Sequence, residues 1–256
     1  MDILNHPLIA ERYFFPRPHP VPEAVVIDTP GGPLLAHHRI FNPDWPTLVH
    51  FHGNGEAVAN YCPGTVERWG GLGVNLFFAE YRGYGGSAGR PLLGQMLDDV
   101  AAYRESLGIP DSRIIVYGRS VGSLFALEWV DRFPETGGLI LDSAVADVQE
   151  RLRMRIDPRE LGVSGEAFAA ACSARLDHQK KLSGYRFPVL ILHARRDHLV
   201  DASHAERLRQ WCVSPDSRLI LFARGDHNSV YWENQDRFEN SLRGYIAMER
   251  AWTPLE

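Results

Sequence analysis

Short apolar runs recur along the chain, and stretches with helical periodicity lie between them. Six of the runs are almost wholly apolar, a pattern typical of parallel strands that are covered on both faces of a sheet. We predict these buried strands at residues 47–51, 74–79, 114–117, 138–141, 189–193 and 219–222. We predict helices between them at residues 56–72, 92–107, 121–132, 203–211 and 234–249. This alternation favours an α/β fold with helices on both faces of the sheet.

Two further apolar runs, at residues 24–28 and 34–41, precede this pattern. The segment between them, residues 29–33, reads TPGGP, and its prolines and glycines are typical of a turn. Two strands joined by such a turn form an antiparallel hairpin, which we place at an edge of the sheet. The complete prediction is therefore a mostly parallel, eight-stranded sheet.

The interval 143–187 has no strand signal but contains two or three helix-like segments. Asp147 and Ser164 stand where N-caps of such helices are expected. We therefore predict one domain over residues 1–256, in which this interval is a helical cap insertion that influences substrate choice. Four arginines of the interval suit either a solvated helix face or the binding of an anionic substrate group or lipid headgroup: Arg151, Arg153, Arg155 and Arg159.

The composition supports a compact domain, with 45% hydrophobic and 23% charged residues. A formal net charge of -5 argues against binding to nucleic acid, which needs a dense basic surface. The three cysteines are widely separated and form no C-x-x-C pair, so neither a disulfide framework nor a zinc knuckle is indicated. Residues 1–22 are rich in proline and do not resemble a signal peptide, and no apolar run is long enough to span a membrane. We expect a cytoplasmic protein.

The segment Gly118-Arg119-Ser120-Val121-Gly122 has the pattern G-x-S-x-G and stands directly between a predicted strand and a predicted helix. A serine at such a turn exposes its hydroxyl, and the residues two before and two after it must be small so that the turn can close. The first N–H groups of the helix point toward a negative charge that forms on a bound carbonyl oxygen. We predict Ser120 as a nucleophile and the N–H of Val121 as an oxyanion donor; an ordinary surface serine is the alternative.

A serine nucleophile needs a base within hydrogen-bond reach and a third group that orients the base. His227 follows the last predicted strand, at the carboxyl edge of the sheet where ligands meet this class of fold. Asp197 follows the preceding strand at the same edge. We predict both as partners of Ser120, although His227 could be a surface-turn residue. The acid also has rivals: Asp201, Asp142 and Asp226.

The loop after the first buried strand contains His52-Gly53-Asn54-Gly55, and its glycines permit the close backbone approach that an oxyanion donor needs. We assign the second donor N–H to Asn54, with Gly55 as the alternative. His50 and His52 share one face of the strand, but no third ligand follows at suitable spacing. Two histidines alone make a poor zinc site, so we expect no metal.

Residues 83–88 read GYGGSA and match the outline of a dinucleotide-binding loop, G-x-G-x-x-A after a strand. Pro91 follows where the phosphate-binding helix would already have begun, and a proline there ends a helix. We therefore interpret this segment as a glycine-rich loop beside the site, and we expect no cofactor.

Taken together, these motifs resemble the α/β-hydrolase superfamily, and specifically its Bem46-like branch, over nearly the whole chain. The matching segments are HGNG at 52–55, YRGYGGS at 81–87, GRSVG at 118–122, LHARRD at 192–197 and GDHN at 225–228. Glu80, Ala194 and Ser123 stand where the family commonly has aspartate, glycine and glycine. None of these departures touches the predicted triad.

The resemblance implies an α/β-hydrolase fold and cleavage of an acyl ester or thioester through an acyl-enzyme on Ser120. Members of the branch include esterases, lipid hydrolases and protein depalmitoylating thioesterases, so the expected partner is a small-molecule or lipid-like acyl ester. A binding protein that kept the fold without the activity is the main alternative. An α/β oxidoreductase is another, and Pro91 argues against it.

Overall fold

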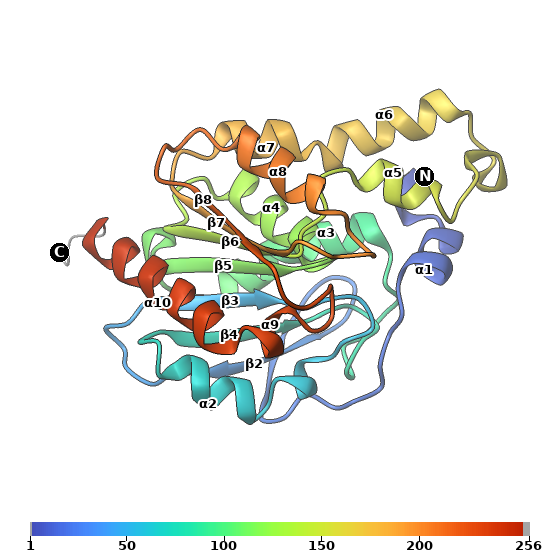
Figure 1. Cartoon of the computed structure of the whole chain (residues 1–256). Coiled ribbons are helices and arrows are strands. Elements are labelled where there is room, and N and C mark those ends of the chain that lie inside the picture. The colour runs from blue at the N-terminus through green and yellow to red at the C-terminus, as the bar shows by residue number, and fades with distance from the viewer. Residues whose placement is uncertain (1, 253–256) are drawn as a thin grey trace.

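The computed structural model describes residues 2–252, which form an eight-stranded sheet between two layers of helices (Figure 1). The strands are β1 (Ala24–Ile27), β2 (Leu34–Arg39), β3 (Thr47–Phe51), β4 (Asn75–Glu80), β5 (Ile114–Arg119), β6 (Gly138–Asp142), β7 (Val189–Ala194) and β8 (Arg218–Phe222). Their order across the sheet is β1-β2-β4-β3-β5-β6-β7-β8. β2 pairs antiparallel with β1 and β4, and the other neighbours are parallel. The predicted mostly parallel sheet and its antiparallel edge hairpin are confirmed.

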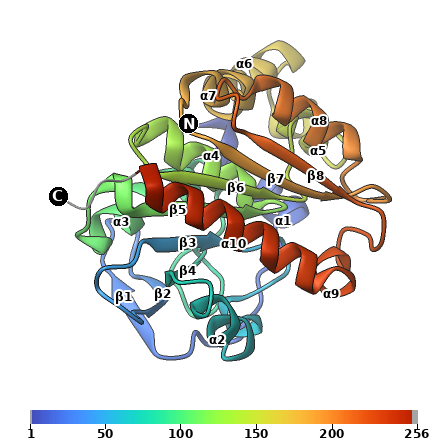
Figure 2. The same cartoon turned by 60° about the vertical axis from the view of Figure 1, so that its left-hand side comes forward.

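Side chains of each central strand alternate between two apolar cores, as the pleat of a strand requires. In β5, Val116 belongs to one core, and its neighbours Ile115 and Tyr117 belong to the other. The first core is covered by α3 (Leu93–Leu107), α4 (Gly122–Arg132), α7 (His178–Gly184) and α8 (Ala202–Trp211). The second is covered by α2 (Gly64–Gly70) and by α10 (Gln235–Trp252), and α10 crosses the near face of the sheet in Figure 2.

The register of the parallel strands aligns their carboxyl ends at one edge of the sheet. Phe51 at the end of β3 pairs with Gly118 of β5, and Arg119 pairs with Asp142 at the end of β6. The loops that follow these strands therefore leave the sheet side by side. This edge is where the sequence placed the candidate chemistry.

The segment 2–22 contains helices that the sequence analysis did not predict, η1 (Ile3–Asn5) and α1 (Pro7–Tyr13). The signal was present, because His6 accepts the N–H of Leu8 as an N-cap and Pro7 occupies the first helical position. The prolines that follow this short helix are typical of irregular structure, so the sequence pattern did not predict a helix here. Tyr13 and Phe14 are buried, so the segment is part of the folded domain.

The predicted helix over 56–72 is wrong in extent. The structure has a single 3-10 turn, η2 (Val58–Asn60), and α2 begins only at Gly64. Pro63 lies between them, and a proline has no N–H to donate and its ring clashes with the preceding helical turn. The predicted C-terminal helix is α10, which is preceded by the short α9 (Val230–Glu233). A further 3-10 turn, η3 (Asp111–Arg113), leads into β5.

The interval 143–187 contains α5 (Val148–Arg153), η4 (Pro158–Leu161), α6 (Gly165–Leu176) and α7. Asp147 accepts the N–H of Glu150, and Ser164 accepts the N–H of Ala167, so both predicted N-caps are confirmed. α7 packs against α4 and α8 within the helix layer. That this interval acts as a cap stays a prediction. Among residues 2–252, no helix combines the length and the apolar character needed to cross a lipid bilayer.

Candidate active site

Ser120 lies in the turn between β5 and α4, with φ at +51°. A non-glycine residue adopts this left-handed conformation only when its surroundings enforce it. A Cβ at Gly122 would lie 2.1 Å from the carbonyl oxygen of Phe51, and one at Gly118 would lie 2.7 Å from the Cβ of Ala126. The two glycines of the motif are therefore required by close packing of the turn against β3 and α4.

The structure brings Ser120, His227 and Asp197 together from three separate loops. Nε2 of His227 lies 2.8 Å from Oγ of Ser120, and Nδ1 lies 2.6 Å from Oδ2 of Asp197. An ionised carboxylate only accepts hydrogen bonds, so the Nδ1 proton of His227 belongs to this contact and Nε2 is left as an acceptor. The hydroxyl of Ser120 can therefore donate to Nε2, which is the arrangement that activates a serine.

The carboxylate of Asp197 is held in place from two sides. Its Oδ1 accepts the N–H groups of Leu199 and Val200, at 2.9 and 2.8 Å. Burial raises the pKa of the Asp197 carboxyl, but hydrogen bonds, the one from His227 first and the one from the N–H of Val200 after it, help to hold the pKa below its usual value. His193 lies 3.4 Å from the same carboxylate and is a neighbour that the sequence analysis did not identify. Asp197 is therefore an oriented, ionised partner for His227.

The three rival acids are engaged elsewhere. Asp201 caps the first turn of α8, Asp142 accepts the hydroxyl of a buried tyrosine, and Asp226 accepts N–H groups of its own loop. Of the four candidates, Asp197 is the one whose carboxylate contacts the ring of His227.

The two predicted oxyanion donors both lie at the carboxyl edge of the sheet. Val121 directly precedes the first residue of α4, and Asn54 lies in the loop after β3. Within residues 2–252, the backbone N–H of neither residue makes a hydrogen bond. Both N–H groups are thus available to a ligand. Their joint role as an oxyanion hole, with Gly55 as the alternative to Asn54, stays a prediction.

The side chain of Asn54 makes contacts that the sequence did not reveal. Its amide donates to the carbonyl of Tyr13, and its Oδ1 accepts the N–H of Phe15 at 3.0 Å and the hydroxyl of Tyr84 at 3.2 Å. The segment after α1 therefore lies against the loop that we assign to the oxyanion. Tyr84 belongs to the glycine-rich loop 83–88, so this loop contacts both the loop after β3 and the segment after α1.

His50 and His52 do not act together. Nε2 of His52 lies 2.9 Å from Oε1 of Glu80, and both side chains are fully buried. Oε2 of Glu80 accepts the N–H of Val58, so this pair links β4 to the loop after β3. His50 lies instead among aromatic rings. In the part of the chain that the structure describes, no three His, Cys, Asp or Glu side chains are grouped as a metal would require.

A partly buried ion pair lies beside the candidate site, and the sequence analysis did not assign it. Arg119, the second residue of the G-x-S-x-G motif, forms an ion pair with Glu56 and donates from Nη2 to the carbonyl of His227 at 2.9 Å. Glu56 also accepts the N–H of Gly53 at 2.7 Å and the hydroxyl of Tyr61 at 2.6 Å. The bridge therefore connects the loop after β3 with the histidine loop beneath the site. Adjacency in sequence to HGNG and to Ser120 was the available signal.

Comparison with known proteins identifies the family. The sequence profile of the Hydrolase_4 family, described as serine aminopeptidase, S33, matches residues 44–171, which is half of the chain. The chain belongs to this family. It is thereby a member of the α/β-hydrolase superfamily, as the motifs predicted.

Two similar proteins are of the Bem46-like branch that the motifs resemble. The uncharacterized protein YfhR of Escherichia coli K12 is 28% identical over 195 residues, which are 72% of this chain and 64% of YfhR. Human alpha/beta hydrolase domain-containing protein 17B is 26% identical over 207 residues, which are 79% of this chain and 67% of that protein. The chain thus spans about two thirds of the length of these relatives.

Solved structures confirm the fold. Est1E from Butyrivibrio proteoclasticus, solved with ferulic acid bound, superposes with a TM-score of 0.74 at 19% identity, over 89% of this chain and 100% of that one. Alpha/beta hydrolase domain-containing protein 10 from mouse superposes with a TM-score of 0.69 at 17% identity, over 89% of this chain and 99% of that one. The predicted α/β-hydrolase fold is therefore correct.

Proposed function

We propose that this chain is a serine hydrolase that cleaves carboxylic esters or thioesters through an acyl-enzyme on Ser120. The observation that supports the proposal is the continuous contact from Ser120 through His227 to Asp197, with distances of 2.8 and 2.6 Å. The left-handed backbone of Ser120 and the two unpaired N–H groups nearby suit the same chemistry.

The geometry implies a two-step reaction. Nε2 of His227 takes the hydroxyl proton as Oγ of Ser120 bonds to the acyl carbon, and the carbonyl electrons move onto the oxygen. The N–H groups of Asn54 and Val121 stabilise that oxyanion, and Asp197 stabilises the imidazolium. The oxyanion then collapses, and the leaving alcohol or thiol takes the proton from His227. Water attacks the acyl-enzyme by the same route and releases the acid.

The nucleophile is tested with p-nitrophenyl esters from acetate to laurate. We expect the wild type to hydrolyse them and Ser120→Ala to lose about 10⁴- to 10⁶-fold in kcat, because the covalent route disappears. Ser183→Ala, which changes an exposed serine on α7, serves as the matched control and keeps full activity. Equal turnover by the wild type and Ser120→Ala would refute the role of Ser120.

The orienting role of Asp197 has a separate test. Asp197→Asn places an amide against Nδ1 of His227 and favours the wrong tautomer, so we expect kcat to fall by about 10³- to 10⁴-fold with little change in KM. An unchanged kcat would show that Asp197 does not orient the base.

The alternative is a non-catalytic protein with the same fold, and covalent labelling separates the two. A fluorophosphonate reacts with an activated serine, so mass spectrometry of the wild type is expected to find the adduct on Ser120. A folded wild-type protein that takes up no label and hydrolyses no ester would favour the binding protein.

The leaving group is tested in the same assay. The matched family is described as serine aminopeptidase, and the Est1E structure holds ferulic acid, so alanyl-p-nitroanilide and methyl ferulate enter the panel beside the esters. We expect esters and S-acyl thioesters to turn over and the anilide to remain intact. Preferential cleavage of the anilide would replace the ester assignment with a peptidase. The acyl chain that is cleaved fastest indicates the length of the acyl pocket, which we expect beneath the proposed cap interval, 143–187.

A further inference from the structure

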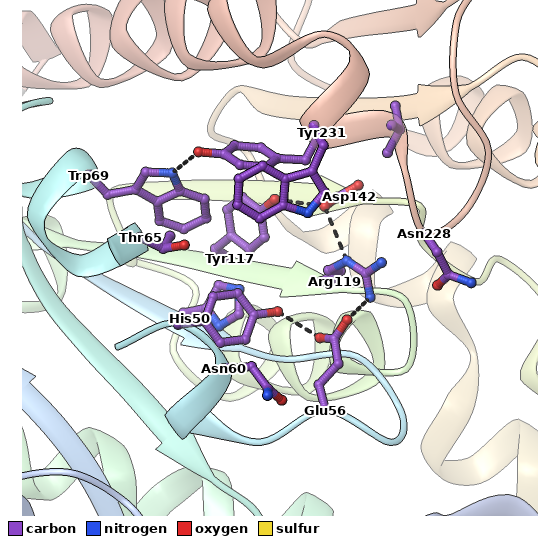
Figure 3. Close-up of a pocket in the computed structure, with 13 residues that line it drawn as sticks. His50, Glu56, Asn60, Thr65, Trp69, Tyr117, Arg119, Asp142, Asn228 and Tyr231 are labelled. Carbon is purple, nitrogen blue, oxygen red and sulfur yellow. Dashed lines mark hydrogen bonds and ion pairs between the residues drawn. The ribbon is translucent and has the colours of Figure 1, made fainter. Parts of the chain in front are cut away.

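A cavity of about 260 Å³ lies next to the candidate active site, on the face of the sheet that α2 and α10 cover (Figure 3). Residues from β3, β5, α2, α9 and the loop after β3 line it, and the triad residues Ser120, Asp197 and His227 are not among them. Arg119 connects the cavity with the candidate active site, because it lines the cavity and donates to the carbonyl of His227. Asn228, which follows His227 in the chain, lines the cavity as well. The ester hydrolysis proposed above does not use this space.

Tyrosine and tryptophan side chains contribute five of the thirteen lining residues. They are Tyr61, Trp69, Tyr117, and the neighbouring Tyr231 and Trp232 of α9. The polar atoms of four of them are already engaged: Tyr61 donates to Glu56, Tyr117 to Asp142, Trp69 to Tyr231 and Tyr231 to Glu239. The rings therefore present apolar surface to the cavity. Trp232 is 61% exposed, which places an aromatic ring at the mouth.

The floor of the cavity contains a buried polar side chain without a partner. His50 is 1% exposed, and its ring lies 4.9 Å from that of Tyr117 and 4.5 Å from that of Tyr61. Within residues 2–252, neither ring nitrogen of His50 has a hydrogen-bond partner. Burial lowers the pKa of His50 well below its usual value, so the ring is neutral and has one donor and one acceptor. An unpaired buried polar group of this kind is costly, and a ligand that pairs with it gains affinity.

The charges around the cavity disfavour an ion of either sign. Glu56 and Asp142 line it beside Arg119, so an anion meets two carboxylates. Both carboxylates are already paired, because Glu56 forms an ion pair with Arg119 and Asp142 accepts the hydroxyl of Tyr117, so a cation finds no free counter-ion and meets the guanidinium of Arg119. An uncharged molecule avoids repulsion by the carboxylates and repulsion by the guanidinium.

We propose that this cavity is a second binding site, for a planar, uncharged aromatic molecule of one or two rings with one hydrogen-bonding group. Its volume of about 260 Å³ supports that size, because an apolar cavity of roughly 150 Å³ is enough to bind benzene. The rings of Trp69 and Tyr117, with centroids 5.2 Å apart, supply the aromatic contacts. His50 supplies the polar one.

Calorimetric titration with indole and with indene tests the ligand class. The two molecules have the same shape, and only indole has an N–H that can donate to His50. We expect indole to bind about 2- to 12-fold more tightly, the range that one net hydrogen bond provides. Absence of binding at millimolar indole would overturn the site. Equal affinity for indole and indene would overturn the role of His50, and tighter binding of indole-3-acetate would overturn the preference for an uncharged ligand.

A pair of variants at one position locates the binding. Thr65 lines the cavity from α2 and takes no part in the proposed hydrolysis. Thr65→Phe fills the space and is expected to weaken indole binding at least tenfold, whereas Thr65→Val keeps the shape and the affinity. Circular dichroism of both variants, and an unchanged Tm, report that they are folded. Unchanged indole affinity in a folded Thr65→Phe variant would overturn the assignment.

Two measurements separate this site from the proposed active site. Ser120→Ala is expected to bind indole with wild-type affinity although it no longer hydrolyses esters. Failure of ester hydrolysis in the wild type would refute the proposed function and leave indole binding intact. Competitive inhibition of p-nitrophenyl butyrate hydrolysis by indole would show instead that the cavity belongs to the substrate site, and the proposal of a second site would be wrong.

Discussion

The ion pair between Arg119 and Glu56 leads to a prediction about stability. Replacing Arg119 with methionine keeps an unbranched side chain but removes the charge beside Glu56 and the hydrogen bond to the carbonyl of His227. The Arg119 side chain is 14% exposed and that of Glu56 is 25% exposed, so the remaining carboxylate stays largely out of water. Arg119→Met therefore leaves a buried charge without its counter-ion.

The size of the effect follows from what Glu56 retains. Removing one partner of a fully buried pair costs about 3–5 kcal/mol. Glu56 is partly exposed and still accepts the N–H of Gly53 and the hydroxyl of Tyr61, so the loss should lie below that range. We expect the free energy of unfolding to fall by about 2–3 kcal/mol, which corresponds to a decrease in Tm of about 4–12 °C for a domain of this size.

The stability loss caused by Arg119→Met should become smaller as the pH falls. Burial raises the pKa of Glu56, but the charge of Arg119 and the hydrogen bond from Tyr61 outweigh it, and the pKa lies below its usual value. A carboxyl with a depressed folded pKa stabilises the protein above its unfolded pKa, about 4.3 for glutamate, and loses that contribution as the pH falls through the folded value. The difference between wild type and Arg119→Met should therefore be full at pH 7 and narrow below about pH 4.

Urea denaturation followed by circular dichroism, at a series of pH values, measures both quantities. Arg119→Lys is the matched control, since lysine keeps the charge beside Glu56 but one ammonium cannot also replace the fork that reaches His227. We expect it to lose less than half as much stability as Arg119→Met. A loss below about 1 kcal/mol for Arg119→Met at pH 7, or a loss that does not change between pH 7 and pH 3.5, would refute this reasoning.

Other positions give independent tests. Gly122→Ala places a Cβ 2.1 Å from the carbonyl oxygen of Phe51, so we expect a stability loss of about 1–3 kcal/mol or more in urea denaturation. Gly244→Ala is its control, because no atom lies within 4 Å of the new Cβ in α10, and it should stabilise the protein by about 0.5–1 kcal/mol. Glu128→Leu removes the carboxylate 2.6 Å from buried Lys181, and we expect a loss of about 3–5 kcal/mol; a wild-type Tm would contradict it.

The sequence by itself determined the features that depend on neighbouring residues. Strand and helix periodicity indicated the elements, and the need for small residues around Ser120 is a property of one tight turn. The helix predicted over 56–72 is longer than the observed one, because the apolar periodicity continues through Pro63, where the helix is interrupted. The position of each candidate at the carboxyl end of a strand also followed from local order, because parallel strands end at a common edge.

The tertiary structure decided which of several equivalent residues meet. Asp197 and Asp201 lie in one loop, and only the folded positions of β7 and β8 select the carboxylate that contacts His227. The bridge from Glu56 to Arg119 joins residues far apart in the chain. Such contacts depend on the relative positions of loops that are distant in sequence. Strand register and helix packing together determine these positions. The aromatic cavity around His50 arises in the same way, because no single segment contains more than a part of it.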